Sequence, residues 1–133
     1  MIEFGKDRRR IVSIEGAEFK PYDLYGQPQE YLSWAPLNFD VAAGRGHYLL
    51  RFAPGGRSLP HEHTYIEEFL VLEGELVDND GTVLRAGDFV QFAAGSRHFS
   101  TSPTGCLLLV ILHGHNRRLD RREPLSAVAS SSP

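Results

Sequence analysis

The sequence predicts an all-β fold, a sandwich or barrel of short strands, and three observations support this. No long window keeps apolar residues at the three- and four-residue spacing of an amphipathic helix. Short apolar or alternating runs recur instead, separated by glycine or proline. The 13 glycines and 8 prolines lie between those runs at regular intervals, as turns do in an all-β domain.

Seven runs are predicted to be strands: residues 47–52, 59–63, 67–73, 75–77, 82–85, 88–92 and 106–112. Asp80-Gly81 predicts a tight hairpin turn before 82–85, because both residue types tolerate a positive φ. A short edge strand is expected at 11–14, and 22–34 is expected to be a long segment that covers the barrel.

A single domain is expected from the length of 133 residues. Residues 1–40 are assigned to an N-terminal strand and covering segment, 41–116 to the barrel core, and 117–133 to a C-terminal tail. The small, polar stretch from Ser126 onward predicts that this tail is disordered in part.

Charge and composition argue against several function classes. The formal net charge is -3, whereas nucleic-acid binding needs a concentrated basic surface. The basic run of Arg117-Arg118 and Arg121-Arg122 is broken by Asp120 and is interpreted as a solvated tail. No apolar stretch is long enough for a signal core or a membrane span, so a soluble, cytoplasmic protein is expected. The lone Cys106 permits no intrachain disulfide and no cysteine-based zinc cluster.

The residues with the clearest chemical potential begin at His61-Glu62-His63. Side chains two positions apart on a strand project from the same face, so both imidazoles can converge on one point. Glu67 follows three residues after this pair, and His98 comes from a distant strand just after Gly95. His113-Gly114-His115 has the same spacing, but no carboxylate or glycine follows it at matching distances, so spacing alone is a weak signal.

These residues resemble the two motifs of the cupin superfamily. Gly55, His61, His63, Glu67 and Gly74 match the whole first motif. The second motif is matched by Gly87, Gly95 and His98, while Ala93 and Ser102 replace its usual proline and asparagine. The resemblance implies an RmlC-like jelly-roll β-barrel that binds one divalent metal ion through His61, His63, Glu67 and His98. Glu68 is the competing carboxylate, but the motif spacing to Gly74 selects Glu67, and neighbouring strand residues face opposite ways.

Within the superfamily, the stretches 60–74, 95–98 and 104–108 are most similar to ChrR-type cupins. This resemblance implies a metal-dependent dioxygenase acting on a small β-diketone or a phenolic or aryl ketone. The alternatives are a non-enzymatic zinc-binding sensor or ligand-binding domain and a metal-dependent isomerase. The ligand set suits divalent Fe, Zn, Ni, Mn or Cu, and the sequence does not determine which of these metals is bound.

Residues expected to line a substrate pocket share an apolar or aromatic character and lie near the metal motifs: Tyr48, Phe52, Phe69, Val71, Phe92 and Phe99. They predict a small apolar or aromatic ligand. His47 and Tyr65 are weak candidates for a catalytic base or proton relay. The cupin resemblance also implies a homodimer, for which 22–39 is a candidate contact segment.

Overall fold

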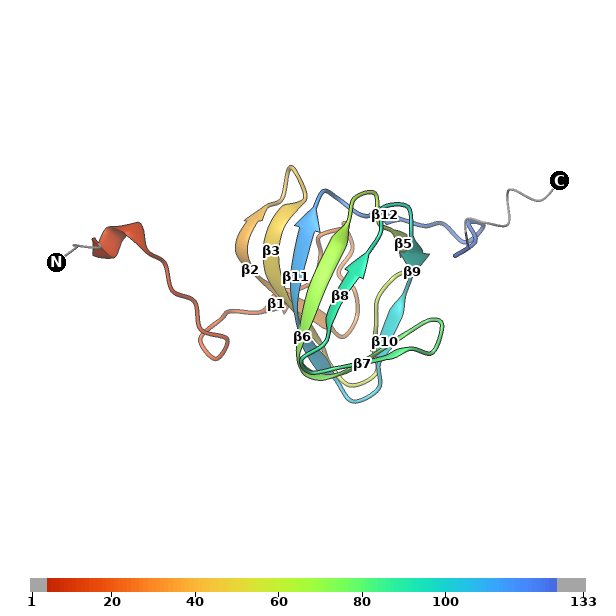
Figure 1. The fold of residues 1–133 in the computed structure, drawn as a ribbon, viewed down its shortest axis with the longest axis horizontal. Coiled ribbons are helices and arrows are strands. Elements are labelled where there is room, and N and C mark those ends of the chain that lie inside the picture. Colours follow the sequence, from red (N-terminus) through yellow and green to blue (C-terminus); the bar gives the residue numbers. More distant parts are fainter. Residues whose placement is uncertain (1–4, 127–133) are drawn as a thin grey trace.

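The computed structural model describes residues 5–126, and within them it has the predicted all-β architecture (Figure 1). Every pair of strands is antiparallel. After a 3-10 turn, η1 (Lys6–Arg8), the strands are β1 (Lys20–Pro21), β2 (Leu32–Asp40), β3 (Arg45–Phe52), β4 (Gly56–Arg57), β5 (His61–Glu62), β6 (Glu67–Asp78), β7 (Val83–Arg85), β8 (Phe89–Phe92), β9 (Arg97–His98), β10 (Ser100–Ser102), β11 (Cys106–His113) and β12 (Arg117–Arg118).

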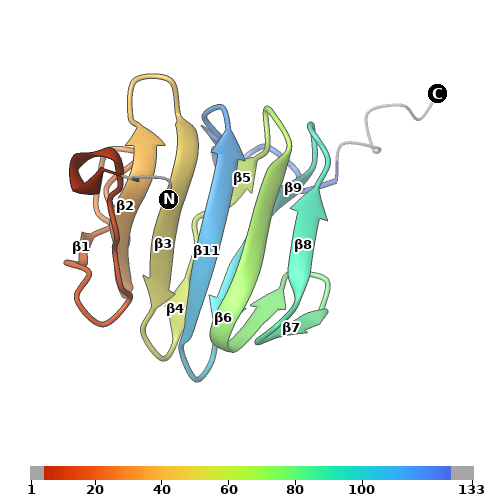
Figure 2. The ribbon, with the colours of Figure 1, turned by 60° about the vertical axis from the view of Figure 1, so that its left-hand side comes forward.

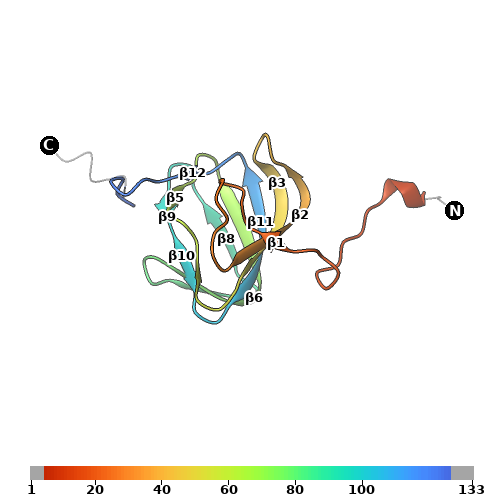
Figure 3. The same ribbon diagram turned by 180° about the vertical axis from the view of Figure 1, so that it is seen from behind.

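One large curled sheet forms most of the barrel wall. Its strands follow the order β1-β2-β3-β11-β6-β10-β4, with β7 and β8 also paired to β6 (Figure 2). A small sheet of β12, β5 and β9 lies behind β6 and β11, and is seen from its own side in Figure 3. The barrel interior is the space between these two sheets.

Side-chain alternation gives the large sheet an apolar inner face. The pairing of β11 with both β3 and β6 places Val110 opposite Tyr48 on one side and Phe69 on the other. All three side chains are about 2% exposed and belong to the main core. Leu49 and Leu107 are adjacent in sequence to inward-facing residues of β3 and β11, and they belong to a second, smaller cluster on the other face. The sequence alternation therefore decides which residues can reach the interior.

Gly74 lies within a continuous strand, whereas the sequence analysis broke the strand there. The register between β11 and β6 shifts near Leu72, which is a β-bulge. Just beyond it, Gly74 adopts φ 77°, a conformation that glycine adopts without steric cost. The strand can therefore bend, so that its first half pairs with β8 and its second half with β7 and β10. This bend carries Asp78 toward the small sheet.

The other predicted elements are mostly confirmed, with differences at the ends of the chain. The hairpin turn at Asp80-Gly81 is present, and Gly81 donates its N–H to the Asp78 carbonyl at 2.9 Å. The strand predicted at 11–14 is wrong, because these residues pair with no strand in the described part of the chain. Only residues 32–34 of the predicted covering segment belong to the barrel wall, because β2 begins there and pairs along β3.

At the C-terminus, the predicted tail begins with a strand. Arg117 and Arg118 pair with Glu62 and His61, and Leu119 is buried. Both arginines are nevertheless exposed, as expected for a solvated basic run. The predicted disorder beyond Ser126 falls on residues 127–133, which lie outside the described residues.

The segment before β1 extends away from the barrel (Figures 1 and 3) and exposes Ile11 at 77%. Among the described residues, no helix is long and apolar enough to cross a membrane. The structure contains one chain, so the homodimer stays a prediction.

Replacing Gly74 with alanine is expected to destabilise the fold more than the same change at Gly81. Both glycines have a positive φ, which costs an alanine about 1–2 kcal/mol. A Cβ at Gly74 would also lie 2.1 Å from the carbonyl oxygen of Gly105, whereas at Gly81 it would meet open space. Steric overlap of this kind adds about 1–3 kcal/mol. Urea unfolding of the two variants measures the difference, and equal losses would contradict the proposed packing.

Candidate metal centre

His61 and His98 face each other because of the register of the small sheet. In β5 and β9, His61 is the direct antiparallel partner of His98, and their ring centroids lie 4.7 Å apart. On the other side of β5, Glu62 accepts a hydrogen bond from Arg97 at 2.9 Å and another from Arg117. These ion pairs tie β9 and β12 to β5 outside the barrel, so the histidine pair remains inside it.

His63 and Glu67 reach the same space from the end of β5 and the start of β6. His63 is fully buried, and its backbone is held by hydrogen bonds with Ser96 and Gly95. Glu67 pairs with Leu112 of β11 and Phe92 of β8, in line with the inward-facing residues of β6. Its carboxylate oxygen lies 3.7 Å from the Nε2 atom of His63.

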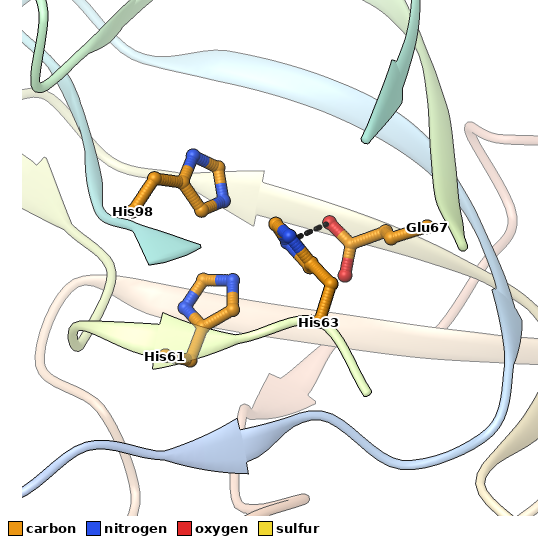
Figure 4. A group of neighbouring side chains, drawn as sticks. All are labelled: His61, His63, Glu67 and His98. Carbon is orange, nitrogen blue, oxygen red and sulfur yellow. Dashed lines mark ion pairs between the residues drawn. The ribbon is translucent and has the colours of Figure 1, made fainter. Parts of the chain in front are cut away.

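The four predicted ligands therefore converge (Figure 4), with one ligand atom from each lying within 4.8 Å of all the others. Ligand atoms on opposite sides of a single ion bound at 2.0–2.2 Å are about 4 Å apart. Small side-chain adjustments therefore suffice for one ion to contact all four.

Hydrogen bonds to the Nδ1 atoms orient the three imidazole rings. The Nδ1–H of His61 donates to the Leu59 carbonyl at 2.7 Å, and that of His98 donates to the Asp78 carboxylate at 2.8 Å. His63 Nδ1 lies 2.8 Å from the Ser96 hydroxyl, which itself donates to the Ala93 carbonyl and therefore accepts from His63. Each ring thus keeps a lone pair on Nε2, the form in which an imidazole binds metal.

The protonation states also favour a cation. Burial is the main cause that lowers the pKa of His61 to about 4, although Glu67 opposes it. Burial alone raises the pKa of Glu67, but His63, His61 and the hydrogen bond from Asn116 outweigh it and lower the pKa to about 2. A neutral His61 beside an ionised Glu67 is the combination that a divalent cation requires.

The Nε2 atom of His63 supplies a direct test of this fit. It is buried and has no hydrogen-bond partner in the described part of the chain, an arrangement that costs free energy in a protein interior. A metal ion accepting its lone pair would remove that cost. The residues therefore fit a metal ion, and the site can hold one.

A narrow cavity of about 50 Å³ opens beside the cluster. His61, Glu67 and His98 are among its lining residues, and so are three of the six predicted pocket residues, Tyr48, Phe52 and Phe69. Further lining residues were not predicted from the sequence, and they include Tyr22, Tyr25, Gln29, Leu32, Asn116 and Arg118. Tyrosines in a predicted covering segment and an asparagine after the last core strand carry no sequence signal for this role.

The other three predicted pocket residues do not line the cavity. Val71 is buried in the hydrophobic core and is 1% exposed. Phe92 lies behind the ligands, stacked on His63 with centroids 4.8 Å apart and packed against His98 at 4.3 Å. Phe99 lies under the guanidinium of Arg57, 4.0 Å from the ring centroid. Phe92 therefore supports the metal ligands rather than a substrate.

Neither of the weak catalytic candidates, His47 and Tyr65, lines the cavity. His47 is exposed, because its neighbour Tyr48 faces inward and adjacent strand residues alternate. Tyr65 is 57% exposed and packs against Gly114. An isomerase that relies on either residue as its base is therefore not supported.

Glu68, the rejected carboxylate, lies on the outer face as predicted. Its carboxylate accepts a hydrogen bond from the Gln91 side chain. The other carboxylate oxygen lies 3.0 Å from Nε2 of His113. His115 contacts the Val41 carbonyl. The second His-x-His pair is thus separate from the metal centre.

Comparison with known proteins places these features in a family. The family described as the ChrR cupin-like domain matches residues 11–116. A comparison with curated protein sequences finds no match.

Several solved structures have the same fold. Acetylacetone dioxygenase from Acinetobacter johnsonii has a TM-score of 0.71 at 13% identity, covering 96% of this chain and 87% of that one. The polyketide cyclase RemF from Streptomyces resistomycificus has a TM-score of 0.65 at 19% identity, covering 94% of both chains. A chain in the Rhodobacter sphaeroides complex of SigE with the anti-sigma ChrR has a TM-score of 0.58 at 20% identity, covering 74% of this chain and 49% of that one.

Exchanging Glu67 for glutamine is expected to weaken metal binding, while Glu68→Gln leaves it unchanged. The two carboxylates are adjacent in sequence but only Glu67 belongs to the cluster. Removing its charge should lower affinity by at least about 10–100-fold, the range found for losing an outer-shell partner. Metal analysis after dialysis against a graded chelator measures this, and equal retention by both variants would exclude Glu67 as a ligand.

Asp78→Ala is expected to weaken metal binding although all four ligands remain. The change removes the acceptor that orients His98, which should cost about 10–100-fold in metal affinity. Asp80→Ala in the same turn is the control, because the Asp80 carboxylate accepts a hydrogen bond from the backbone N–H of Thr82 and does not orient a metal ligand. The same chelator competition measures both, and an Asp78 variant that matches the control would show that this hydrogen bond is dispensable.

Proposed function

The chain belongs to the ChrR cupin-like domain family, and we propose that it is a metal-dependent dioxygenase that acts on a small β-diketone or a phenolic or aryl ketone. One observation carries this proposal. Three histidines and a carboxylate that fit a metal ion lie beside a cavity whose walls are mostly apolar. Such a site combines a metal with a binding place for a small organic ligand.

A divalent ion held by His61, His63, Glu67 and His98 would supply Lewis acidity to an oxygen atom of the bound substrate. The chain's own residues would do the rest. Apolar side chains, among them Leu50, Phe52, Leu76 and Leu108, exclude water from the cavity. Arg118 also lines the cavity and is opposite His61 in the β12–β5 pair. Its positive charge favours an anionic ligand such as a deprotonated diketone.

The fold comparisons support this class of reaction without deciding it. Acetylacetone dioxygenase shares the fold over nearly the whole chain at 13% identity. The cavity volume of about 50 Å³ is small beside the 300–1,000 Å³ of drug-sized sites. A compact substrate is therefore preferred.

A non-enzymatic zinc-binding domain is the second candidate, and it has its own support. Four ligand groups can close a tetrahedral zinc site and leave no position for substrate. One of the similar folds belongs to a complex with an anti-sigma protein. In this case the ion would serve the fold, so stripping it should unfold the chain.

Oxygen uptake decides between the two candidates. The iron-reconstituted protein is expected to consume oxygen with at least one member of a panel of β-diketones and hydroxylated aryl ketones. His61→Ala should reduce the rate by at least about 100-fold, because a ligand loss exceeds the 10–100-fold effect of outer-shell losses. His113→Ala, an exposed histidine outside the cluster, should leave the rate unchanged.

Uptake no faster than that of free iron, across the whole panel, would remove the dioxygenase proposal. Circular dichroism of the metal-stripped protein then tests the second candidate. An apo protein that keeps its fold would argue against structural zinc.

A further inference from the structure

The small sheet of β12, β5 and β9 (Figure 3) carries a row of three side chains across its inner face. Arg118 is the direct antiparallel partner of His61, and His61 is the direct partner of His98. Residues directly opposite each other on antiparallel strands project from the same face, with their Cβ atoms about 5 Å apart. Arg118 therefore starts on the face of the sheet that carries two metal ligands, and it lines the cavity together with them.

The arginines on the outer face of this sheet have a carboxylate partner, whereas Arg118 has none. Arg97 and Arg117 lie on either side of Glu62, and both donate hydrogen bonds to its carboxylate. The side chain of Arg118 has no hydrogen bond or ion pair with any residue in the described range 5–126. Its partner in the inner row is an imidazole, so the guanidinium is available to a ligand.

Arg118 lies where the cavity meets the solvent, because it lines the cavity and is also exposed. Among the described lining residues, Arg118 and Glu67 are the two with acidic or basic side chains other than histidine. Glu67 accepts a hydrogen bond from Asn116 and belongs to the metal cluster. The positive charge of Arg118 is therefore the one that remains for recognising the part of a ligand that does not bind the metal.

A ligand carboxylate matches this group best. A guanidinium is always charged, and its planar fork donates two parallel hydrogen bonds to the two oxygen atoms of a carboxylate. A ketone or hydroxyl oxygen carries no charge and would pair with a single N–H group. The cavity of about 50 Å³ leaves room for only a short carbon chain, so the carboxylate and the ketone must lie close together in the ligand.

We infer that Arg118 is a specificity residue that binds the carboxylate of a small oxo acid at the mouth of the cavity. This inference rests on the proposed function for the binding of the ketone oxygen at the metal. The direct pairing of Arg118 with His61 sets the charge beside the metal centre, which suits a ligand whose two oxygen-bearing groups are close together. Oxo acids are thus added to the neutral diketones and aryl ketones as a substrate class, and Arg118 favours them.

A matched pair of ligands tests the role of Arg118 without requiring turnover. The probes are acetoacetate and methyl acetoacetate, which share the ketone and the carbon chain, but only the acid is negatively charged at neutral pH. Calorimetric titration in the absence of oxygen gives the Kd of each probe for the iron-reconstituted protein. Acetoacetate is expected to bind about 10-fold more tightly, the low end for hydrogen bonds to charged groups, because solvent screens an exposed pair.

Arg118→Met removes the charge and keeps a long side chain, and Arg118→Gln is a second neutral variant. In both, the preference for acetoacetate should fall to less than about threefold, while the Kd of the ester stays within about threefold of wild type. Arg121→Met is the matched control, because it removes the same charge from an exposed arginine that does not line the cavity; it should keep the full preference. Thermal unfolding of each variant checks that the fold is intact.

Equal Kd values for the two probes in the wild-type protein, or no binding of either probe, would overturn the inference. So would an unchanged preference in the Arg118 variants, which would mean that the carboxylate binds elsewhere, or an equal loss in Arg121→Met, which would reflect net charge alone. These outcomes are separate from the oxygen-uptake result. A preference that depends on Arg118 without oxygen uptake would keep the carboxylate site and remove the dioxygenase, and oxygen uptake without the preference would do the reverse.

Discussion

The candidate centre depends on the anchoring of three imidazole rings through their Nδ1 atoms. Leu59, Ser96 and Asp78 provide the acceptors, and each hydrogen bond leaves a lone pair on Nε2. The three lone pairs then lie beside the carboxylate of Glu67 with no donor from the described chain to His63 Nε2. Electron-rich atoms gathered in this way repel one another, and a cation relieves the repulsion.

This arrangement requires most of the barrel to be folded first. The anchor for His98 sits at the far end of β6, beyond the bend at Gly74, and the anchor for His63 sits in the turn before β9. Asn116, which holds Glu67, follows the last strand of the large sheet. Because these groups come from separate segments, metal binding and folding should be coupled: an ion bound only by the folded chain stabilises it.

Much of the fold and the ligand set could be predicted from local patterns. Alternation along β6, together with the motif spacing, separates the inward Glu67 from the outward Glu68. Other features had no local signal. Asp78 and Tyr25 looked like turn and covering residues, and Phe92 looked like a pocket wall although it packs behind His63. Their roles come from contacts between segments that are distant in sequence.

The sequence by itself therefore determined the strand class and the inner faces, because residue type and a period of two act over a few residues. The four candidate ligands followed from the resemblance to the two cupin motifs. The tertiary structure alone decided which groups orient those ligands and what the cavity presents to a substrate. Strand register contributed to that decision, because it sets His61 opposite His98. Register is a property of paired strands, so no single segment of the chain contains it.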